Sequence, residues 1–361
     1  MAVAILTLIL ATGASAASWS QRRITDDPPL AMAVDDSGHV HVVLESGAGL
    51  RYMSNATGRW TSASITSFGS QPSIALSAGK VYVVFARIGD CDAEDGCTKD
   101  PNQGLYYATN RSGAWKTQRL PDTKPAYWPS LRMRDGKLSI AYNHLNGIRY
   151  LTNSSGSWVD RQVWRTSTTL TSSARTSLAL DGSGHPYIAF MRTRCTRTPQ
   201  FGWCAATRTT LRGISLTTRS GGEWVTSVAS QPGDTQDTLD RVVIDPAGKP
   251  IVGFTHELAS GALRFRVTRF DEMDSTSSRT LPGTGKGSFA LDGQGRIELV
   301  RWADGTLTWR AERTSGWLST SWSTPRVSAA WVRSVDGVTT IVRNGFAKQL
   351  PAYAAWVLTR D

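Results

Sequence analysis

Apolar and polar residues alternate along this chain in short runs, which are separated by Gly, Asp, Asn and Ser. In Ser177–Phe190 two such runs flank the turn Asp-Gly-Ser-Gly, a third run follows at Gly213–Thr218, and a fourth starts at Trp224. Alternation with a period of two is typical of β-strands that have one buried face. This stretch therefore predicts four consecutive strands joined by turns.

The same four-strand pattern recurs along the chain at a spacing of roughly fifty residues. One four-stranded sheet cannot bury both of its faces, so repeated sheets of this kind pack side by side around an axis. We therefore predict an all-β fold, a seven-bladed β-propeller. The expected blades are approximately 28–66, 70–120, 128–163, 174–229, 238–281, 284–324 and 326–361.

The two ends of this pattern complement each other. Ser18–Ile24 resembles the fourth strands of other units but precedes any first strand, whereas the last unit supplies three strands and no fourth. Pairing of the two ends removes two free sheet edges. We therefore expect Trp19–Ile24 to pair with Tyr353–Leu358 and to close the last blade, which makes residues 17–361 a single domain.

The first sixteen residues are apolar or small, carry no charge and end in Ala-Ser-Ala. This composition is typical of a secretory signal peptide, and the apolar run from Ala2 to Ala11 is too short to span a bilayer. We expect residues 1–16 to be removed, and the mature protein to be secreted and extracellular, without membrane insertion.

Four cysteines fall in two pairs, and each pair lies within one loop between strands. In an exported protein this local spacing favours two disulfides over a metal site, because neither loop contains a His. The expected disulfides are Cys91–Cys97 and Cys195–Cys204.

The first of these loops is also acidic. Asp90, Asp92 and Glu94 have a spacing close to that of a calcium-binding loop, although the glycine comes one residue late for the EF-hand pattern. Two interpretations stay open: a calcium site, or a solvated acidic loop that pairs with the basic second loop. We expect no other cofactor.

The chain carries a net charge of +11. An excess of this size favours an anionic partner or surface, although a basic exported protein can carry it without such a partner. Nucleic acid is not expected, because export and the missing interleave of basic and aromatic residues argue against it. We expect the partner to be an acidic glycan or a cell-surface polysaccharide, and the protein to be a monomer.

Alignment of the units shows where basic residues converge. Two places after the aromatic residue of the second strand stand Arg87, His144, Arg192 and His256. At an equivalent position near the start of the innermost strands stand Gln71, Trp128, Arg175, Lys286 and Arg326. Such a rim suits a carboxylate or sulfate beside a sugar ring stacked on Trp128. The alternative is a rim that is basic for solubility.

Other recurring residues have a structural interpretation. The aspartates that precede turn glycines are expected to cap the first hairpin of a blade: Asp35, Asp181, Asp245 and Asp292. The tryptophans that open the outer strands are expected to pack between blades: Trp60, Trp115, Trp158 and Trp224. Three asparagines share one turn position and are expected to form turns: Asn55, Asn110 and Asn153.

The segments 108–115 and 151–158, which end in Asn-Arg-Ser-Gly-Ala-Trp and Asn-Ser-Ser-Gly-Ser-Trp, resemble the Asp-box turn of bacterial neuraminidase repeats, with Asn in place of Asp. This resemblance covers the mature chain as a repeat pattern and implies a sialidase-like propeller. Sialidases of that family carry an Arg-Ile-Pro element, an Arg triad for the substrate carboxylate and a Tyr–Glu pair. Arg23-Ile-Thr25 is the nearest match to the first element, and no Glu-x-Arg follows the first hairpin.

Three function classes follow from these features. A glycan-binding propeller needs only the rim and a stacking aromatic, and we place it first. A glycan-cleaving enzyme, either a sialidase-like glycosidase or a polysaccharide lyase, also needs a positioned acid or base. The candidates for that role are His144, His256, Glu257 and Asp304. A protein-interaction scaffold needs only the surface, and fold alone does not decide among the three. Arg264, on the third strand of its unit, is expected to lie away from the rim.

Overall fold

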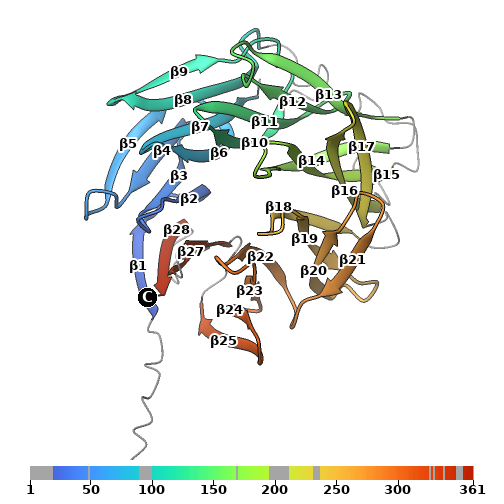
Figure 1. The fold of residues 1–361 in the computed structure, drawn as a ribbon. Coiled ribbons are helices and arrows are strands. Elements are labelled where there is room, and N and C mark those ends of the chain that lie inside the picture. The colour runs from blue at the N-terminus through green and yellow to red at the C-terminus, as the bar shows by residue number, and fades with distance from the viewer. Residues whose placement is uncertain are drawn as a thin grey trace, which may run out of the picture.

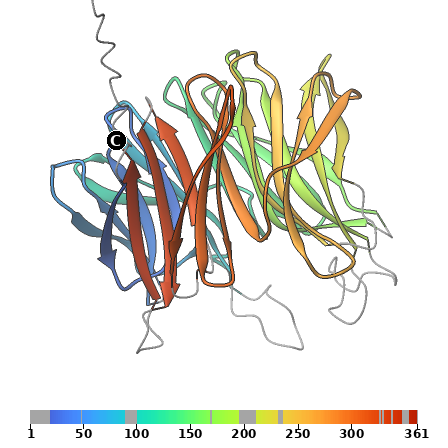
Figure 2. The ribbon, with the colours of Figure 1, turned by 90° about the horizontal axis from the view of Figure 1, so that it is seen from below.

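The structure, a computed structural model, describes residues 19–47, 49–88, 100–167, 170–194, 211–230, 236–324, 327, 330–335, 338–346 and 353–360. These residues form seven four-stranded sheets that stand side by side around a central axis (Figure 1). From the side, the strands run between the two faces of a disc (Figure 2). Within the described residues no helix is long and apolar enough to cross a membrane. The predicted seven-bladed β-propeller is confirmed.

In the first four blades the strands follow one another in the chain and in the sheet, and the first strand is innermost. Blade one consists of β2 (Pro29–Val34), β3 (Val40–Ser46), β4 (Gly49–Ser54) and β5 (Thr61–Thr66). Blade two consists of β6 (Ser70–Ser77), β7 (Lys80–Arg87), β8 (Gly104–Ser112) and β9 (Ala114–Arg119). Blade three consists of β10 (Tyr127–Arg134), β11 (Lys137–His144), β12 (Gly147–Thr152) and β13 (Val159–Arg165). Blade four consists of β14 (Leu170–Leu180), β15 (Pro186–Arg194), β16 (Leu211–Ser220) and β17 (Glu223–Ser230).

The next two blades repeat this order, and the last one departs from it. Blade five consists of β18 (Asp237–Ile244), β19 (Pro250–Glu257), β20 (Leu263–Phe270) and β21 (Thr276–Thr280). Blade six consists of β22 (Lys286–Leu291), β23 (Ile297–Ala303), β24 (Thr306–Arg313) and β25 (Gly316–Ser323). Blade seven consists of β26 (Ala330–Val335), β27 (Val338–Phe346), β28 (Tyr353–Arg360) and β1 (Trp19–Thr25).

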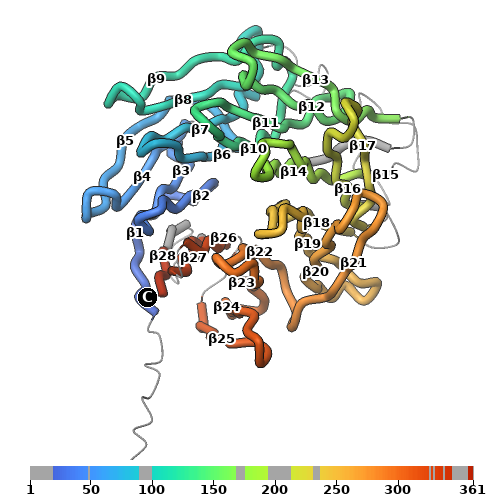
Figure 3. Tube along the Cα trace, viewed as in Figure 1, coloured from blue at the N-terminus to red at the C-terminus, as the bar shows by residue number. Residues whose placement is uncertain are grey.

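The first strand of the chain closes the ring. β1 pairs antiparallel with β28, with Trp19 opposite Arg360 and Arg23 opposite Trp356, and the two strands lie side by side in Figure 3. The Trp19 ring packs edge-on against Trp309 and Trp322 of blade six, with centroids 5.2 and 5.0 Å away. The predicted pairing of the two ends is therefore confirmed, and it also joins blade seven to blade six.

Side-chain hydrogen bonds stabilise the turns, as the positions of the Asp and Asn residues in the repeats predict. The Asp35 carboxylate accepts hydrogen bonds from the backbone N–H groups of Ser37 (2.9 Å) and His39 (2.8 Å), and the other three hairpin aspartates repeat this pattern. The side-chain oxygens of the asparagines in the outer turns accept hydrogen bonds from the backbone N–H of the first or second residue of the second strand. These bonds join Asn55 to Val40, Asn110 to Val81, and Asn153 to Leu138.

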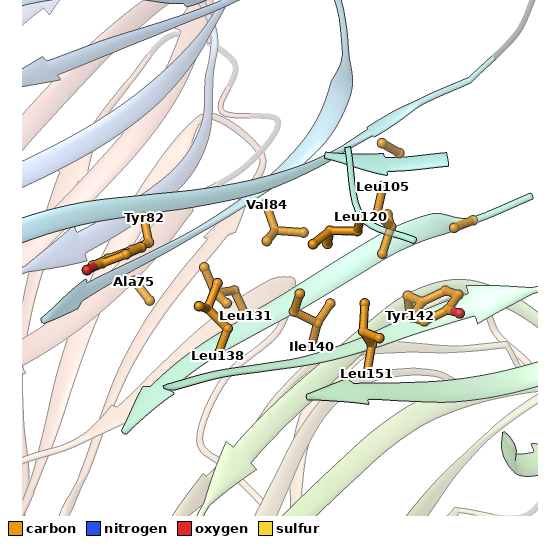
Figure 4. Close-up of a cluster of buried hydrophobic side chains, with 12 residues drawn as sticks. Ala75, Tyr82, Val84, Leu105, Leu120, Leu131, Leu138, Ile140, Tyr142 and Leu151 are labelled. Carbon is orange, nitrogen blue, oxygen red and sulfur yellow. The ribbon is translucent and has the colours of Figure 1, made fainter. Parts of the chain in front are cut away.

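The hydrophobic core lies between neighbouring blades. One cluster joins blade two, with Tyr82, Val84 and Leu105, to blade three, with Leu131 and Ile140, whose side chains face one another in Figure 4. Clusters of this kind lie at the other blade interfaces too. The outer-strand tryptophans pack against them as predicted: Trp60, Trp115, Trp158 and Trp224.

The innermost strands are tied to each other by hydrogen bonds across the blade interfaces. Leu131 N donates to Ser73 Oγ (2.9 Å), Leu178 N to Ser130 Oγ (2.9 Å), and Val242 N to Ser177 Oγ (3.0 Å). Between blades five and six the Asp240 carboxylate takes this role and accepts from Phe289 N (3.0 Å). This ladder sets the height of each inner strand relative to the next and so decides which side chains share a level in the channel.

Candidate functional site

The four basic residues at the ends of the second strands occupy one structural position. Each lies two residues after an aromatic side chain that is fully buried: Phe85, Tyr142, Phe190 or Phe254. Arg87 pairs with Gly104, His144 with Gly147, and Arg192 with Gly213 on the third strands. The alignment of the repeats therefore holds in the structure, and these residues lie at one edge of their blades.

Arg87 is already engaged within the protein. Its Nε donates to Asp100 Oδ2 (2.7 Å), and its guanidinium lies 4.9 Å from the centre of the Phe68 ring. Hydrogen bonds from the Asn102 amide and from Arg87 hold the pKa of the Asp100 carboxyl below its usual value. The charge of Arg87 is thus largely balanced before any ligand arrives, and a third of its side chain stays exposed.

His144 and Arg192 are both half-buried. Burial, together with the nearby Arg149 guanidinium, lowers the pKa of His144. The backbone N–H of Asn146 donates to His144 Nδ1 (3.2 Å), which places the lone pair on that nitrogen. A hydrogen bond with the backbone of Lys124 opposes this decrease in pKa, so the imidazole is engaged within the protein before any ligand binds.

His256 forms a hydrogen-bonded pair with a buried carboxyl group. Its Nδ1 lies 2.7 Å from Oδ1 of Asp237, whose side chain is 1% exposed, and Ser230 Oγ donates to the other carboxyl oxygen. Burial raises the pKa of Asp237, and the hydrogen bond with His256 opposes that rise. The pair fixes the orientation of the imidazole, which leaves Nε2 as the atom that can exchange a proton with a ligand.

A cavity of about 480 Å³, the mouth cavity, opens where the innermost strands begin. Trp128, Arg175 and Gln71 line it, as the alignment of the repeats suggests, together with parts of six inner strands. Arg175 is exposed to the cavity, and burial by the surrounding protein lowers its pKa. The four rim residues at the second-strand ends are not part of this lining. The residues expected at one rim therefore form two sets: an inner set on the first strands, which lines the cavity, and an outer set on the second strands, which does not.

The backbone around Trp128 holds an uncommon conformation. Trp128 and Gln71 have φ values of 51° and 55°, in the left-handed region that favours glycine. Trp128 N donates to Gln71 Oε1 (2.7 Å), and Thr176 Oγ1 donates to Trp128 O (2.7 Å). Three consecutive blades thus fix this residue, and strain held in this way is concentrated at functional sites.

Three arginines that sequence analysis did not single out line the deeper part of the cavity: Arg132, Arg241 and Arg333. Asp240, whose carboxylate accepts from Arg241 Nε (3.2 Å), lies among them, and Glu45 lies exposed at the outer edge. For Arg132 and Arg333, comparison of the repeats shows an unusual residue at a position that is small in most blades. At the position of Arg132 and Arg333, four other blades carry Ala33, Ala75, Ala179 and Ala290.

The other candidates lie in several places. Glu257 ends β19 and is half-buried, whereas Asp304 is exposed in the turn between β23 and β24, with a φ of 47° that suits this turn. Arg264 was expected away from the rim, but this is wrong, since the strand register places it opposite His256. Arg23, the nearest match to the sialidase element, lies on the outermost strand of blade seven and pairs with Asp26.

The acidic and disulfide candidates lie outside the described residues, as do the signal segment and Arg326. These candidates are Asp90, Asp92 and Glu94, with Cys91, Cys97, Cys195 and Cys204. In the part of the chain that the structure describes, no three His, Cys, Asp or Glu residues are grouped to hold a metal ion.

No family model matches the sequence, and no curated protein matches it. Among solved structures, the fold is similar to that of an ulvan lyase from a new family of polysaccharide lyases, bound to -[GlcA(1-4)Rha3S]-. The two chains are 12% identical, with a TM-score of 0.67, and the match covers 93% of this chain and 95% of that one. Virginiamycin B lyase from Staphylococcus aureus has 11% identity, a TM-score of 0.56, and coverage of 95% and 99%. Polysaccharide lyase Uly1 has 9% identity, a TM-score of 0.54, and coverage of 92% and 90%. At these identities the likeness shows the fold alone.

Proposed function

We propose that this protein binds an acidic saccharide in the mouth cavity, with the rim residues Arg87, His144, Arg192 and His256 around it. The observation that carries the proposal is the lining itself, in which two indoles, those of Trp128 and Trp331, occur with four guanidinium groups and only two carboxylates. The volume of about 480 Å³ lies within the roughly 300–1,000 Å³ typical of ligand pockets.

Each part of the ligand has a matching group in the cavity. Arg175 offers charge-assisted hydrogen bonds to a carboxylate or sulfate, and such bonds to arginine are often bidentate. The Trp128 indole offers an apolar face to a sugar ring, which carries C–H groups on one side. Gln71 supports this arrangement, because it holds the backbone of Trp128 in place.

The fold comparison guides the choice of probe. The ulvan lyase structure is that of a complex with -[GlcA(1-4)Rha3S]-, a polymer repeat. An oligosaccharide with carboxylate and sulfate groups is a sensible first probe for a cationic cavity. The proposal also includes the extracellular setting, the two disulfides and, as one interpretation of the acidic loop, a bound calcium ion.

The experiment begins with an array of anionic and neutral glycans and continues with calorimetry on the best binder. Arg175→Ala should weaken binding by about ten- to a hundredfold, the scale of one charge-assisted hydrogen bond of roughly 1.5–3 kcal/mol. Arg219→Ala is the matched control, because Arg219 is exposed next to the outer turn of blade four, where its Nε donates to the Gly222 carbonyl (3.1 Å). Equal weakening by both substitutions would show that the attraction is diffuse charge.

A second candidate function, cleavage of the bound glycan, is supported by the His256–Asp237 pair. A buried carboxyl group that orients an imidazole is a common arrangement for a general base. If the protein cleaves its ligand, His256→Ala should abolish the release of new sugar ends even at saccharide concentrations that saturate the binding site. Unchanged product release would exclude His256 as the base, whether the chemistry is sialidase-like or that of a lyase.

A further inference from the structure

Two cavities along the central channel share part of their lining. The mouth cavity meets an opposite cavity of about 590 Å³, which is lined by the other ends of the inner strands. Five residues line both cavities, and we call them the waist: Met32, Ile74, Arg132, Arg241 and Arg333. The three arginines come from β10, β18 and β26, which surround the centre of the ring in Figure 3.

Arg241 is the fixed member of the waist. It lies at the register position that Ser130 and Ser177 hold on their inner strands, while its neighbour Asp240 accepts the hydrogen bond of the ladder. Its Nε donates to Asp240 (3.2 Å), its Nη1 to the Val332 carbonyl (3.3 Å), and its Nη2 to Ser288 Oγ (2.5 Å). Neighbours in three blades therefore hold this guanidinium in one orientation.

Arg132 and Arg333 are tied more loosely. Within the described residues, Arg132 donates one hydrogen bond, from Nη1 to the Leu131 carbonyl (2.8 Å), and Arg333 donates one, from Nη1 to the Val332 carbonyl (3.0 Å). Both bonds go to the preceding residue on the same strand. Each guanidinium has five N–H groups and lines both cavities, so these two bonds leave several donors of each arginine for another partner.

Positive charge at the waist exceeds the nearby negative charge. Burial, and then repulsion from Arg241, lower the pKa of Arg132 to about 10, so the group is still charged at pH 7. Of the acidic residues that line the two cavities, Asp240 alone contacts a waist arginine in the described structure. Like charges held together away from water are costly unless an opposite charge joins them.

We infer that the waist is a binding site for a small oxyanion: a sulfate, a phosphate or a carboxylate. Planar guanidinium groups from three non-adjacent blades surround the site and match the oxygens of such an anion. The anion has two sources, a free inorganic ion or the acidic group of a saccharide in the mouth cavity. Only the second source rests on the proposed function.

The first test uses inorganic sulfate alone. The protein is dialysed into chloride buffer and titrated with sodium sulfate at constant ionic strength, and calorimetry should show saturable binding of one ion. Arg132→Ala combined with Arg333→Ala should weaken that binding at least tenfold. Alanine suits both positions, because Ala75, Ala179 and Ala290 occupy them in other blades. Each single variant should weaken binding severalfold, which keeps the test valid if the double variant does not fold.

The control removes the same number of positive charges at positions away from the channel. Arg59→Ala combined with Arg111→Ala removes two exposed arginines from outer turns and should leave sulfate binding within twofold of wild type. The inference is overturned if wild type shows no saturable sulfate binding, or if the waist and control variants lose affinity equally.

A second titration separates the two sources of the anion. If saturating sulfate weakens the binding of an acidic oligosaccharide to wild type but not to the waist variant, the saccharide places its acidic group at the waist. If sulfate and saccharide bind together, the waist holds a free ion. If sulfate binds and no saccharide does, the proposed function fails and the waist site stands.

Discussion

At the scale of single residues, the mouth of the channel depends on Trp128. Trp128 lines the mouth cavity with a backbone φ of 51°, which an L-residue adopts at a cost. The hydrogen bonds with Gln71 and Thr176 compensate for that cost. A bulky side chain at a position that favours glycine is best explained by a role of the side chain itself.

Two substitutions at this residue separate backbone strain from ligand contact. Both Trp128→Ala and Trp128→Gly remove the indole and should weaken saccharide binding to the same extent. Since glycine adopts positive φ without strain, Trp128→Gly should unfold with a free energy about 1 kcal/mol higher than Trp128→Ala in urea. A more stable alanine variant would contradict the left-handed conformation.

At the scale of strands, the contact between blades six and seven contains a buried acid. Glu298 on β23 is 3% exposed, and it accepts a hydrogen bond from Thr339 Oγ1 on β27 (2.7 Å). Burial raises the pKa of Glu298, so the folded protein holds its proton more tightly than the unfolded chain does. Its contribution to stability is present at low pH and is lost as the pH rises through the folded-state pKa.

Replacement of this acid should therefore stabilise the protein at neutral pH. Glu298→Gln keeps an oxygen for Thr339 and removes the buried charge, so we expect a free energy of unfolding about 1 kcal/mol higher at pH 7. The gain should shrink towards pH 4. Thermal unfolding of both proteins across that range measures it, and a gain that grows at low pH would contradict the assignment.

Glu312 on β24 is the control, with the opposite sign. Its hydrogen bond with Arg279 lowers its pKa, so its contribution is present at neutral pH and is lost as the pH falls through the folded-state pKa. Glu312→Gln should lower stability at pH 7, by less than about 1 kcal/mol because the pair is partly exposed. The two variants should therefore shift the unfolding temperature in opposite directions at pH 7.

At the scale of the whole molecule, stability depends on the closure of the ring by β1. This strand supplies the outer edge of blade seven, and its Trp19 contacts two tryptophans of blade six. Loss of the strand would expose an edge and open one interface in the ring.

One side chain tests this closure without removal of the strand. Trp19→Ala should lower the free energy of unfolding by about 2–4 kcal/mol, somewhat below the range for fully buried tryptophans because Trp19 is half-buried. Arg22→Ala, on the exposed face of the same strand, should change it by less than about 0.5 kcal/mol. Chemical denaturation measures both, and equal effects would show that closure does not depend on the tryptophan cluster.

The architecture was predictable because its determinants are local and repeated. Asp35 and Asn110 bond to backbone groups of their own blade, and Trp115 opens an outer strand in the same way as its counterparts. Because these features recur in each repeat, the alternation of apolar and polar residues and the turn residues were enough to count the blades and to pair the two ends of the chain. The equivalence of Arg87 and His144 follows from the same repetition.

The site was decided by the tertiary structure. Which side chains meet in the channel depends on how far each inner strand is displaced along the axis and which of its faces turns inward, and hydrogen bonds between blades set both. Arg132 and Arg333 stand 201 positions apart in the sequence and meet only because blades three and seven face the same axis. The sequence by itself determined seven closed blades and one shared strand-end position for Arg87, His144, Arg192 and His256. The ring alone decided that arginines from alternate blades share the waist, because that depends on distances across the channel that no single repeat contains.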